Sequence, residues 1–113
     1  MKLGPVTPIL RIFDERKARE FYVDFLGFKV EWEHRFEPDL PAFASIARGR
    51  ARIYLSEHAG DGGPDTLIYI RHSDVDTLAD LLGQCPTEVP WGRELKVEDP
   101  DGNRVRISDP IDD

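Results

Sequence analysis

The sequence repeats one order of predicted elements, a strand followed by a helix and three more strands, with a spacing of about 55 residues. The repeat lies in the order of the elements and not in residue identity. The only linker-like composition, at residues 60–65, falls between the two halves. A chain of 113 residues has the length of one domain. We therefore predict one α+β domain over residues 1–113, with a βαβββ unit at about 5–58 and a second at about 65–109.

The first unit is predicted from apolar periodicity. Residues 6–13 are rich in apolar side chains and predict a strand. Asp14 can cap a helix over residues 15–26, where apolar side chains recur every three or four positions before Gly27. Residues 42–47 and 51–56 are predicted as further strands, joined by a tight turn. Residues 28–36, which follow the helix and precede these two strands, are predicted as a strictly alternating strand. One of its faces is made of Phe28, Val30, Trp32, His34 and Phe36.

The second unit follows the same order. Residues 66–71 predict a strand, and Ser73 or Asp74 can cap a helix that reaches about Leu82 and ends at Gly83. A short extended piece at 87–89 precedes a β-hairpin over residues 90–107, whose turn is Asp99-Pro100-Asp101-Gly102-Asn103. Trp91 and Gly92 stand at the entrance of the hairpin. An aromatic plate beside a residue without a side chain predicts a flat, open surface for a ligand.

Charge and cysteine content limit the possible functions. The chain has 15 basic and 22 acidic residues, a formal charge of −7. This balance disfavours nucleic acid and anionic membranes and suits a cationic or neutral partner, although an acidic surface can also serve solubility alone. No apolar run approaches the ~20 residues of a membrane span, and no signal peptide is evident, so we expect a cytoplasmic protein. The single cysteine, Cys85, is expected to be a bystander near a helix end.

Several motifs, taken together with two βαβββ units in one short chain, resemble a known superfamily. The motifs are Phe21-Tyr22 through Leu26-Gly27-Phe28 at the first helix and Asp99-Pro100-Asp101-Gly102-Asn103 before the last strand. They resemble the vicinal oxygen chelate superfamily of glyoxalases, extradiol dioxygenases and bleomycin resistance proteins. Residues 64–67 and 90–94 are similar to the bleomycin resistance proteins in particular. The resemblance covers nearly the whole chain and implies curved mixed sheets around a cleft.

The resemblance also implies where a metal would bind. The superfamily's enzymes hold a divalent ion on a concave surface, at positions that correspond here to Thr7, Tyr54, Leu67 and Arg106. None of these is His, Glu or Gln, whereas such ions need carboxylate or neutral imidazole donors. We therefore expect no metal, no cofactor and no catalytic residue, because the family's chemistry depends on the metal as a Lewis acid.

No other catalytic set is evident in the sequence. His58 follows Glu57, but neighbours on a strand point apart, and His72 is expected to face solvent. The remaining nucleophiles lack a nucleophile elbow or a suitably spaced base: Cys85, Ser45, Ser56 and Ser108. The sequence predicts a binding protein and not an enzyme. A metal-dependent lyase or dioxygenase of the same fold remains the alternative.

The resemblance to the bleomycin resistance proteins implies a cleft in which a planar, cationic drug tail stacks between aromatic rings. The matching positions are Trp32, Tyr69 and Trp91. The positions of the family's acidic groups are matched by Glu31 and Asp65, and the wall is expected to extend to His34, Phe36 and Phe43. A cation over a ring face contributes about 0.5 to 2 kcal/mol. Each of these residues could also be an ordinary core, interface or solvated side chain.

Two features depart from the pattern of the bleomycin resistance proteins. Tyr69 stands where a tryptophan is expected, and the second helix and the loop over residues 84–90 are short. They leave open the binding of another metabolite. Near the closing hairpin, Arg93, Arg104 and Arg106 could bind an anionic group, but pairing with local carboxylates is favoured.

The resemblance further implies a homodimer in which both chains build two equivalent clefts, and two-fold pairing is the commonest oligomer. An exchanged N-terminal strand is one form that such a dimer takes. Our expectation is a metal-free homodimer that sequesters a bleomycin-type drug without breaking a bond.

Overall fold

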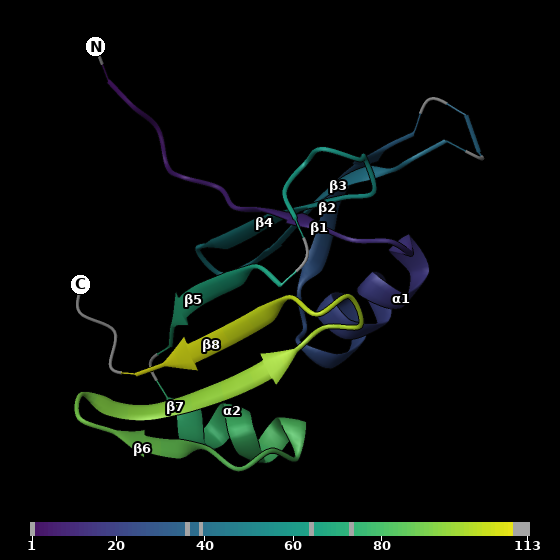
Figure 1. The fold of residues 1–113 in the computed structure, drawn as a ribbon. Helices are drawn as coiled ribbons and strands as arrows, with labels where there is room; N and C mark the ends of the chain where they lie inside the picture. The colour runs from purple at the N-terminus through teal and green to yellow at the C-terminus, as the bar shows by residue number, and fades with distance from the viewer. Residues whose placement is uncertain (1, 36, 39, 64, 73, 110–113) are drawn as a thin grey trace.

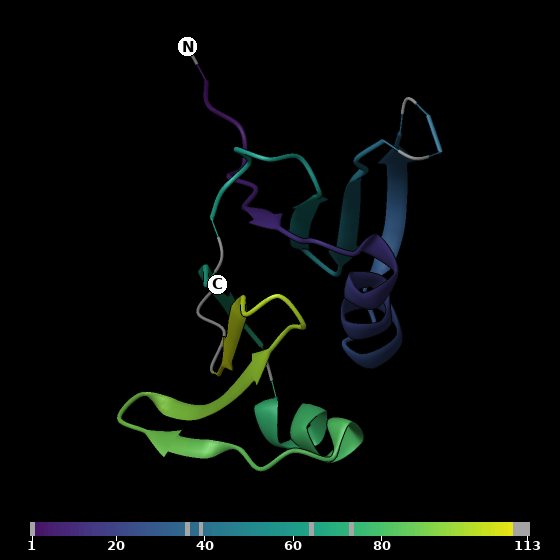
Figure 2. The ribbon, with the colours of Figure 1, turned by 45° about the vertical axis from the view of Figure 1, so that its right-hand side comes forward.

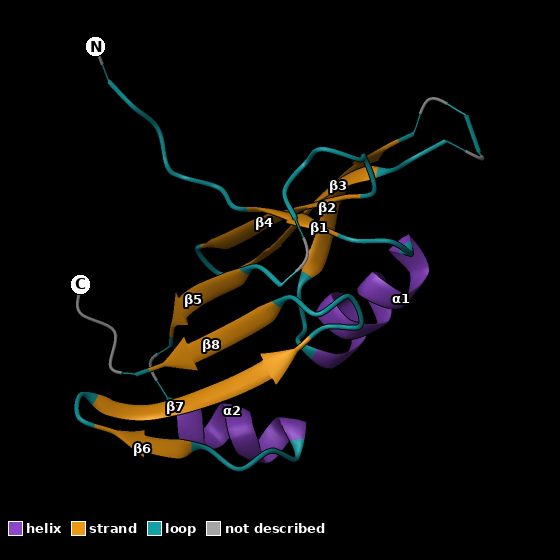
Figure 3. Ribbon diagram, in the orientation of Figure 1, coloured by secondary structure: helices purple, strands orange, loops and turns teal. Residues whose placement is uncertain are grey.

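The computed structural model describes residues 2–35, 37–38, 40–63, 65–72 and 74–109. Within these residues the chain forms two four-stranded mixed sheets, each with one helical segment packed on it (Figures 1 and 3). The strand order is β1-β4-β3-β2 in the first sheet and β5-β8-β7-β6 in the second. The two halves therefore share one topology, and the predicted α+β fold with two βαβββ units is confirmed.

The first unit extends from the first strand to Ser56. Its elements are β1 (Ile9–Arg11), α1 (Glu15–Arg19), η1 (Glu20–Phe25), β2 (Lys29–His34), β3 (Phe43–Arg48) and β4 (Ala51–Ser56). Strand β1 pairs in parallel with β4, and the other neighbours are antiparallel. The strand predicted over residues 6–13 is shorter than expected: it begins after Pro8, which has no backbone N–H to donate.

The second unit repeats this arrangement. Its elements are β5 (Leu67–Arg71), α2 (Val75–Leu82), β6 (Thr87–Val89), β7 (Gly92–Glu98) and β8 (Arg104–Ser108). Strand β5 pairs in parallel with β8, and the other neighbours are antiparallel. Asp74 caps α2 by accepting a hydrogen bond from the Thr77 amide, whereas the alternative cap, Ser73, lies outside the described residues. Figure 2 shows α1 against the first sheet and α2 against the second.

The first helical segment begins as predicted and then changes type. Asp14 caps it, since its Oδ1 accepts hydrogen bonds from the amides of Arg16 at 3.0 Å and Lys17 at 3.4 Å. From Glu20 the segment continues as a π-helix, in which the amide of Leu26 donates to the carbonyl of Phe21. The predicted helix over residues 15–26 is confirmed in extent, and its second half is a π-helix. The segment ends, as predicted, at Gly27, whose φ is +80°.

Replacing Asp14 with alanine is expected to lower the free energy of unfolding by about 1 kcal/mol, because two helix amides lose their acceptor. Urea denaturation of the variant measures this change. Asp24→Ala is the matched control, since Asp24 is an exposed aspartate of the same segment and does not cap it. Equal losses in both variants would show that the cap contributes nothing of its own.

The two units share one hydrophobic core and one buried polar network. The core draws on Leu10, Ile12, Ile46, Ile53 and Leu55 in the first unit and on Val75, Leu78, Leu95, Val105 and Ile107 in the second. The Tyr22 hydroxyl donates to Asp99 Oδ2 at 2.6 Å, and Asn103 Nδ2 donates to the carbonyl of Arg11 at 2.9 Å. The helix of one unit is thus fastened to the hairpin turn of the other.

The helical segments are short relative to a bilayer. Over the part of the chain that the structure describes, none is long and apolar enough to cross a membrane.

Candidate functional site

A β-bulge in β2 determines which side chains reach the open face of the first sheet, the face turned away from α1. Val30 lies opposite Ile46 on the helix-facing side, and Trp32 lies opposite Ser45, so the register shifts by one residue between them. A bulge of this kind re-aims the side chains that follow it. Glu31 and Trp32 therefore both reach the open face. The predicted strict alternation, with Val30 and Trp32 on one side, was wrong.

Trp32 belongs to an aromatic cluster that we call the first wall, made of Trp32, Phe43, Tyr54 and His58. Trp32 and Phe43 stack with ring centroids 5.8 Å apart and planes 13° apart. Tyr54 lies 5.5 Å from Trp32 and 5.3 Å from Phe43, and His58 lies 6.5 Å from Phe43. Trp32 remains 45% exposed, so a flat surface is available for stacking.

The sequence-based prediction named part of this wall. Trp32 and Phe43 are neighbours, as the prediction required, and His34 pairs with Phe43 across the strands. Phe36 lies outside the described residues. The sequence does not predict Tyr54 and His58 as parts of the wall. The signal that could have found Tyr54 is its place in the β3–β4 pairing, which sets it opposite Ser45, whereas His58 follows β4 and no pairing marks it.

Glu31 does not present an unpaired carboxylate to the first wall. It accepts two hydrogen bonds from Arg52, at 2.7 and 3.0 Å, and one from the Ser45 hydroxyl at 2.7 Å. The hydrogen bond from Arg52, followed by that from Ser45, lowers the pKa of Glu31 to about 2. Its negative charge is therefore largely balanced within the chain.

Replacing Arg52 with glutamine is expected to raise the pKa of Glu31 from about 2 toward its ordinary value of 4.5. Because a depressed carboxyl pKa stabilises the fold above the unfolded pKa, this contribution should fade as pH falls from about 4.5 toward 2. Carbonyl NMR of the Glu31 side chain against pH measures the midpoint. An unchanged midpoint in Arg52→Gln would show that the ion pair is absent in solution.

The open face of the second sheet carries a second wall, made of Tyr69 and Trp91. Tyr69 on β5 lies opposite Arg106 on β8, whose guanidinium is 5.7 Å from the tyrosine ring centroid. Trp91 lies in the turn between β6 and β7, where its Nε1 donates to Ser108 Oγ at 3.1 Å. The two rings are 47% and 52% exposed. Both predicted stacking residues therefore lie on one open face.

Gly92 is needed for the backbone beside Trp91. Its φ is +148°, and an added Cβ would lie 2.5 Å from the carbonyl oxygen of Asp109. The Asp109 carboxylate accepts a hydrogen bond from the amide of Arg93 at 2.8 Å. These contacts hold the β6–β7 turn, and so Trp91, against the end of β8.

Two of the three arginines near the hairpin, Arg93 and Arg106, pair with carboxylates, as the sequence favoured, whereas Arg104 donates to the carbonyl of Asp65 at 3.4 Å. Arg106 forms two hydrogen bonds with Glu94, at 2.8 and 3.0 Å, and these bonds raise the pKa of Arg106. Glu94 is only 1% exposed, so its charge requires this partner. Arg93 pairs with Asp76 at 3.0 Å. The charges of Arg93 and Arg106, near the second wall, are therefore balanced by carboxylates of the same chain.

Asp65 lies away from Trp91. It precedes β5, at the end of the β5–β8 pair that contains Leu67 and Arg104, whereas Trp91 contacts Ser108 at the other end. The backbone of Asp65 has a φ of +64°, and its carboxylate lies beside Gly102. A direct role of Asp65 next to Trp91 remains a prediction.

The positions that the resemblance assigned to a metal lie on two different sheets. Tyr54 is on β4, and Leu67 and Arg106 are on β5 and β8. Among the described residues, no group of three or more His, Cys, Asp or Glu side chains lies close enough to hold a metal ion. Tyr54, Leu67 and Arg106 contribute a phenol, a hydrocarbon and a guanidinium, a donor set that does not fit a divalent cation.

His72 differs from the expectation of a solvent-facing side chain. It is half-buried, and its Nδ1 accepts a hydrogen bond from the amide of Asp74 at 2.9 Å. The ring therefore supports the start of α2, and the other ring nitrogen carries the proton of the neutral form.

The comparisons with known proteins agree with this architecture. A family model described as "Glyoxalase superfamily protein" matches residues 1–113, and the chain belongs to that superfamily. No curated protein matches it.

Two solved structures cover almost all of the chain. The bleomycin-binding protein of the bleomycin producer Streptomyces verticillus, solved with copper(II)-bleomycin, is 26% identical over 98% of this chain and 99% of its own, with a TM-score of 0.76. TnmS3, an antibiotic binding protein from Streptomyces sp. CB03234, is 24% identical over the same shares, with a TM-score of 0.77. At this identity, the similarity to TnmS3 supports the fold alone.

Proposed function

We propose that this chain is a cytoplasmic antibiotic-binding protein that sequesters a planar ligand of the bleomycin type, without a resident metal and without breaking a bond. The observation that carries the proposal is the exposure of Trp32, Tyr69 and Trp91 on the open faces of two sheets. Exposed rings of this size are costly in water unless a partner covers them. The likeness to a bleomycin-binding protein supports this ligand class.

The dimer is part of the proposal. Each sheet offers one aromatic wall, and a ligand held between two rings needs a wall on each side. We propose that the first wall of one protomer faces the second wall of its partner, so that a symmetric dimer has two clefts. Nucleic acid and membranes are not proposed as partners, because the chain carries a formal charge of −7.

Calorimetric titration of chelator-treated protein with metal-free bleomycin tests the function. We expect about one ligand bound per chain, together with protection of plasmid DNA from bleomycin cleavage in proportion to the protein added. No heat of binding at millimolar ligand, or undiminished DNA cleavage at excess protein, would contradict the proposal.

Mixing two variants tests the shared cleft. Trp32→Ala and Trp91→Ala each damage one wall, so a heterodimer of the two would contain one intact and one doubly damaged cleft. After denaturation and refolding together, the mixture is expected to recover about a quarter of the wild-type sites, from half of its dimers. No recovery, or a monomeric mass by light scattering, would argue against walls from two chains.

Membership of a superfamily that includes enzymes makes a metal-dependent lyase or dioxygenase the second candidate. Elemental analysis of protein purified without chelator separates the two. Stoichiometric zinc, nickel, manganese or iron would favour the enzyme.

A further inference from the structure

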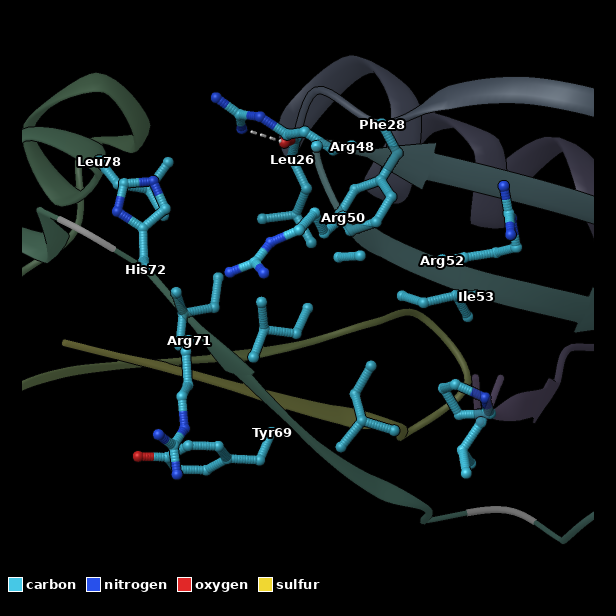
Figure 4. A pocket seen from close by; sticks show the side chains of 17 residues that line it. Leu26, Phe28, Arg48, Arg50, Arg52, Ile53, Tyr69, Arg71, His72 and Leu78 are labelled. Atoms are coloured by element: carbon cyan, nitrogen blue, oxygen red, sulfur yellow. Dashed lines mark hydrogen bonds between the residues drawn. The ribbon is translucent and has the colours of Figure 1, made fainter. Parts of the chain in front are cut away.

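A large cavity is lined by described residues of both units, among them Tyr69 of the second wall, but not by Trp91 or the first wall. It has a volume of about 770 Å³ and lies between the β3–β4 turn and strand β5 (Figure 4). Its apolar lining comes from the core-facing sides of both units: Leu26, Phe28, Ile53, Ile68, Ile70 and Ile107. Sites for drug-sized ligands have volumes of roughly 300–1,000 Å³ and a mainly apolar lining.

The charges around this cavity have one sign. Its described lining includes four arginines, at positions 48, 50, 52 and 71, and no aspartate or glutamate. The chain as a whole has 22 acidic and 15 basic residues, so the charge of the cavity lining is opposite in sign to the net charge of the chain. Arg52 is paired with Glu31, outside the lining, so the excess of positive charge in the lining lies at Arg48, Arg50 and Arg71 and favours an anion.

Two of these arginines define the place of an anionic group. Arg48 is fixed by donating to the carbonyl of Leu26 at 2.6 Å. Figure 4 shows the Arg50 side chain extending into the space between Phe28 and strand β5. Arg50 and Arg71 each have an interaction within the chain, so the argument rests on the sign of the field and not on an unpaired guanidinium. A guanidinium binds carboxylates with two parallel hydrogen bonds.

We propose that this cavity binds an amphipathic carboxylate, with its hydrocarbon body on the apolar lining and its carboxylate at Arg50. The charge of this ligand is opposite to that of a cationic, bleomycin-type drug. The cavity is lined by Tyr69 of the second wall but by neither Trp91 nor any residue of the first wall. The proposal is therefore tested with Arg50 and Trp32, which belong to only one of the two sites.

Dodecanoate below its micellar concentration is a suitable probe, with dodecyltrimethylammonium as the cation of equal chain length. Calorimetry is expected to show about one dodecanoate per chain, bound at least tenfold more tightly than the cation. Octanoate should bind more weakly than dodecanoate, by up to about fourfold for each methylene that the lining buries.

Arg50→Gln should weaken dodecanoate binding about tenfold or more, whereas Arg50→Lys, which keeps the charge, should retain most of it. The matched control is Arg16→Gln, which removes an exposed arginine of α1 that does not line the cavity. Bleomycin binding should be unchanged in Arg50→Gln, and dodecanoate binding should be unchanged in Trp32→Ala. These two results separate this proposal from the proposed function.

Three outcomes would overturn the proposal. The first is equal affinity for the anion and the cation. The second is unchanged binding by Arg50→Gln with a wild-type circular dichroism spectrum. The third is no dodecanoate binding by the native protein, which would mean that a second copy of the chain or another segment closes the cavity.

Discussion

Replacing Trp32 with alanine is expected to weaken the binding of metal-free bleomycin by about tenfold to a hundredfold. Stacking of a planar group on an aromatic side chain contributes about 1–3 kcal/mol by alanine substitution. Trp32 also holds Phe43, 5.8 Å away, and Tyr54, 5.5 Å away, in one surface, so its removal disorganises the wall. Calorimetric titration of the variant measures the change in dissociation constant.

Two further variants make this result specific. Trp32→Phe keeps a flat ring against Phe43 and is expected to retain most of the affinity. Leu81→Ala removes a 75% exposed apolar side chain of α2, outside both walls, and should bind as the wild type does. If Leu81→Ala weakens binding as much as Trp32→Ala, the ligand is held by general hydrophobic contact and the assignment of the wall is wrong.

Replacing Asp99 with alanine is expected to lower the free energy of unfolding by about 3 kcal/mol or more. Asp99 is 4% exposed and accepts from the Tyr22 hydroxyl at 2.6 Å, from the amides of Asn103 and Asp101 at 2.8 and 2.9 Å, and from Asn103 Nδ2 at 3.0 Å. Without the carboxylate, buried donors lose their acceptor, at roughly 1–3 kcal/mol each. Chemical denaturation followed by tryptophan fluorescence measures the loss.

Comparing three variants tests whether the hydrogen bonds to Asp99 account for this loss of stability. Tyr22→Phe removes one hydrogen bond to Asp99 and should cost about 1–2 kcal/mol, less than Asp99→Ala. Burial, followed by the hydrogen bond to Asp99, raises the pKa of the Tyr22 hydroxyl, so the hydroxyl keeps its proton at alkaline pH values at which an ordinary tyrosine ionises. Glu98→Ala, an exposed neighbour, should change stability little. A loss in Asp99→Ala no larger than in Glu98→Ala would show that the network does not fasten the two units together.

The hairpin turn shows which contacts can be predicted from neighbouring residues in the sequence and which cannot. The expectation that its Asp and Asn side chains bond local backbone is met by Asp99, whose Oδ1 accepts from the amides of Asp101 and Asn103. The same side chain also reaches Tyr22, 77 residues earlier in the chain. No local pattern reports such a contact, because it depends on how the two units pack. The order of elements, the caps and the helix ends at Gly27 and Gly83 follow from local rules and were predicted.

The first wall shows why the site was only partly predictable. Alternation in the sequence assigns faces correctly only while the pairing register is unbroken, and the bulge between Val30 and Trp32 breaks it. Polar and apolar residues continue to alternate through the bulge, so the sequence contains no mark of it. Tyr54 joins the wall through strand pairing with β3, a contact that is set by topology and not by spacing. The charge balance at Glu31 likewise depends on Arg52, a residue of another strand.

The side-chain N–H signals of the two tryptophans provide the most direct test of the central claim that Trp32 and Trp91 bind one planar ligand without a metal. The chain has only these two tryptophans, so a nitrogen–proton NMR spectrum contains two indole signals. On addition of metal-free bleomycin to protein in excess chelator, both signals are expected to shift with one midpoint and to saturate near one ligand per chain. If only one signal shifts, if neither does, or if both require an added divalent metal, the claim is contradicted.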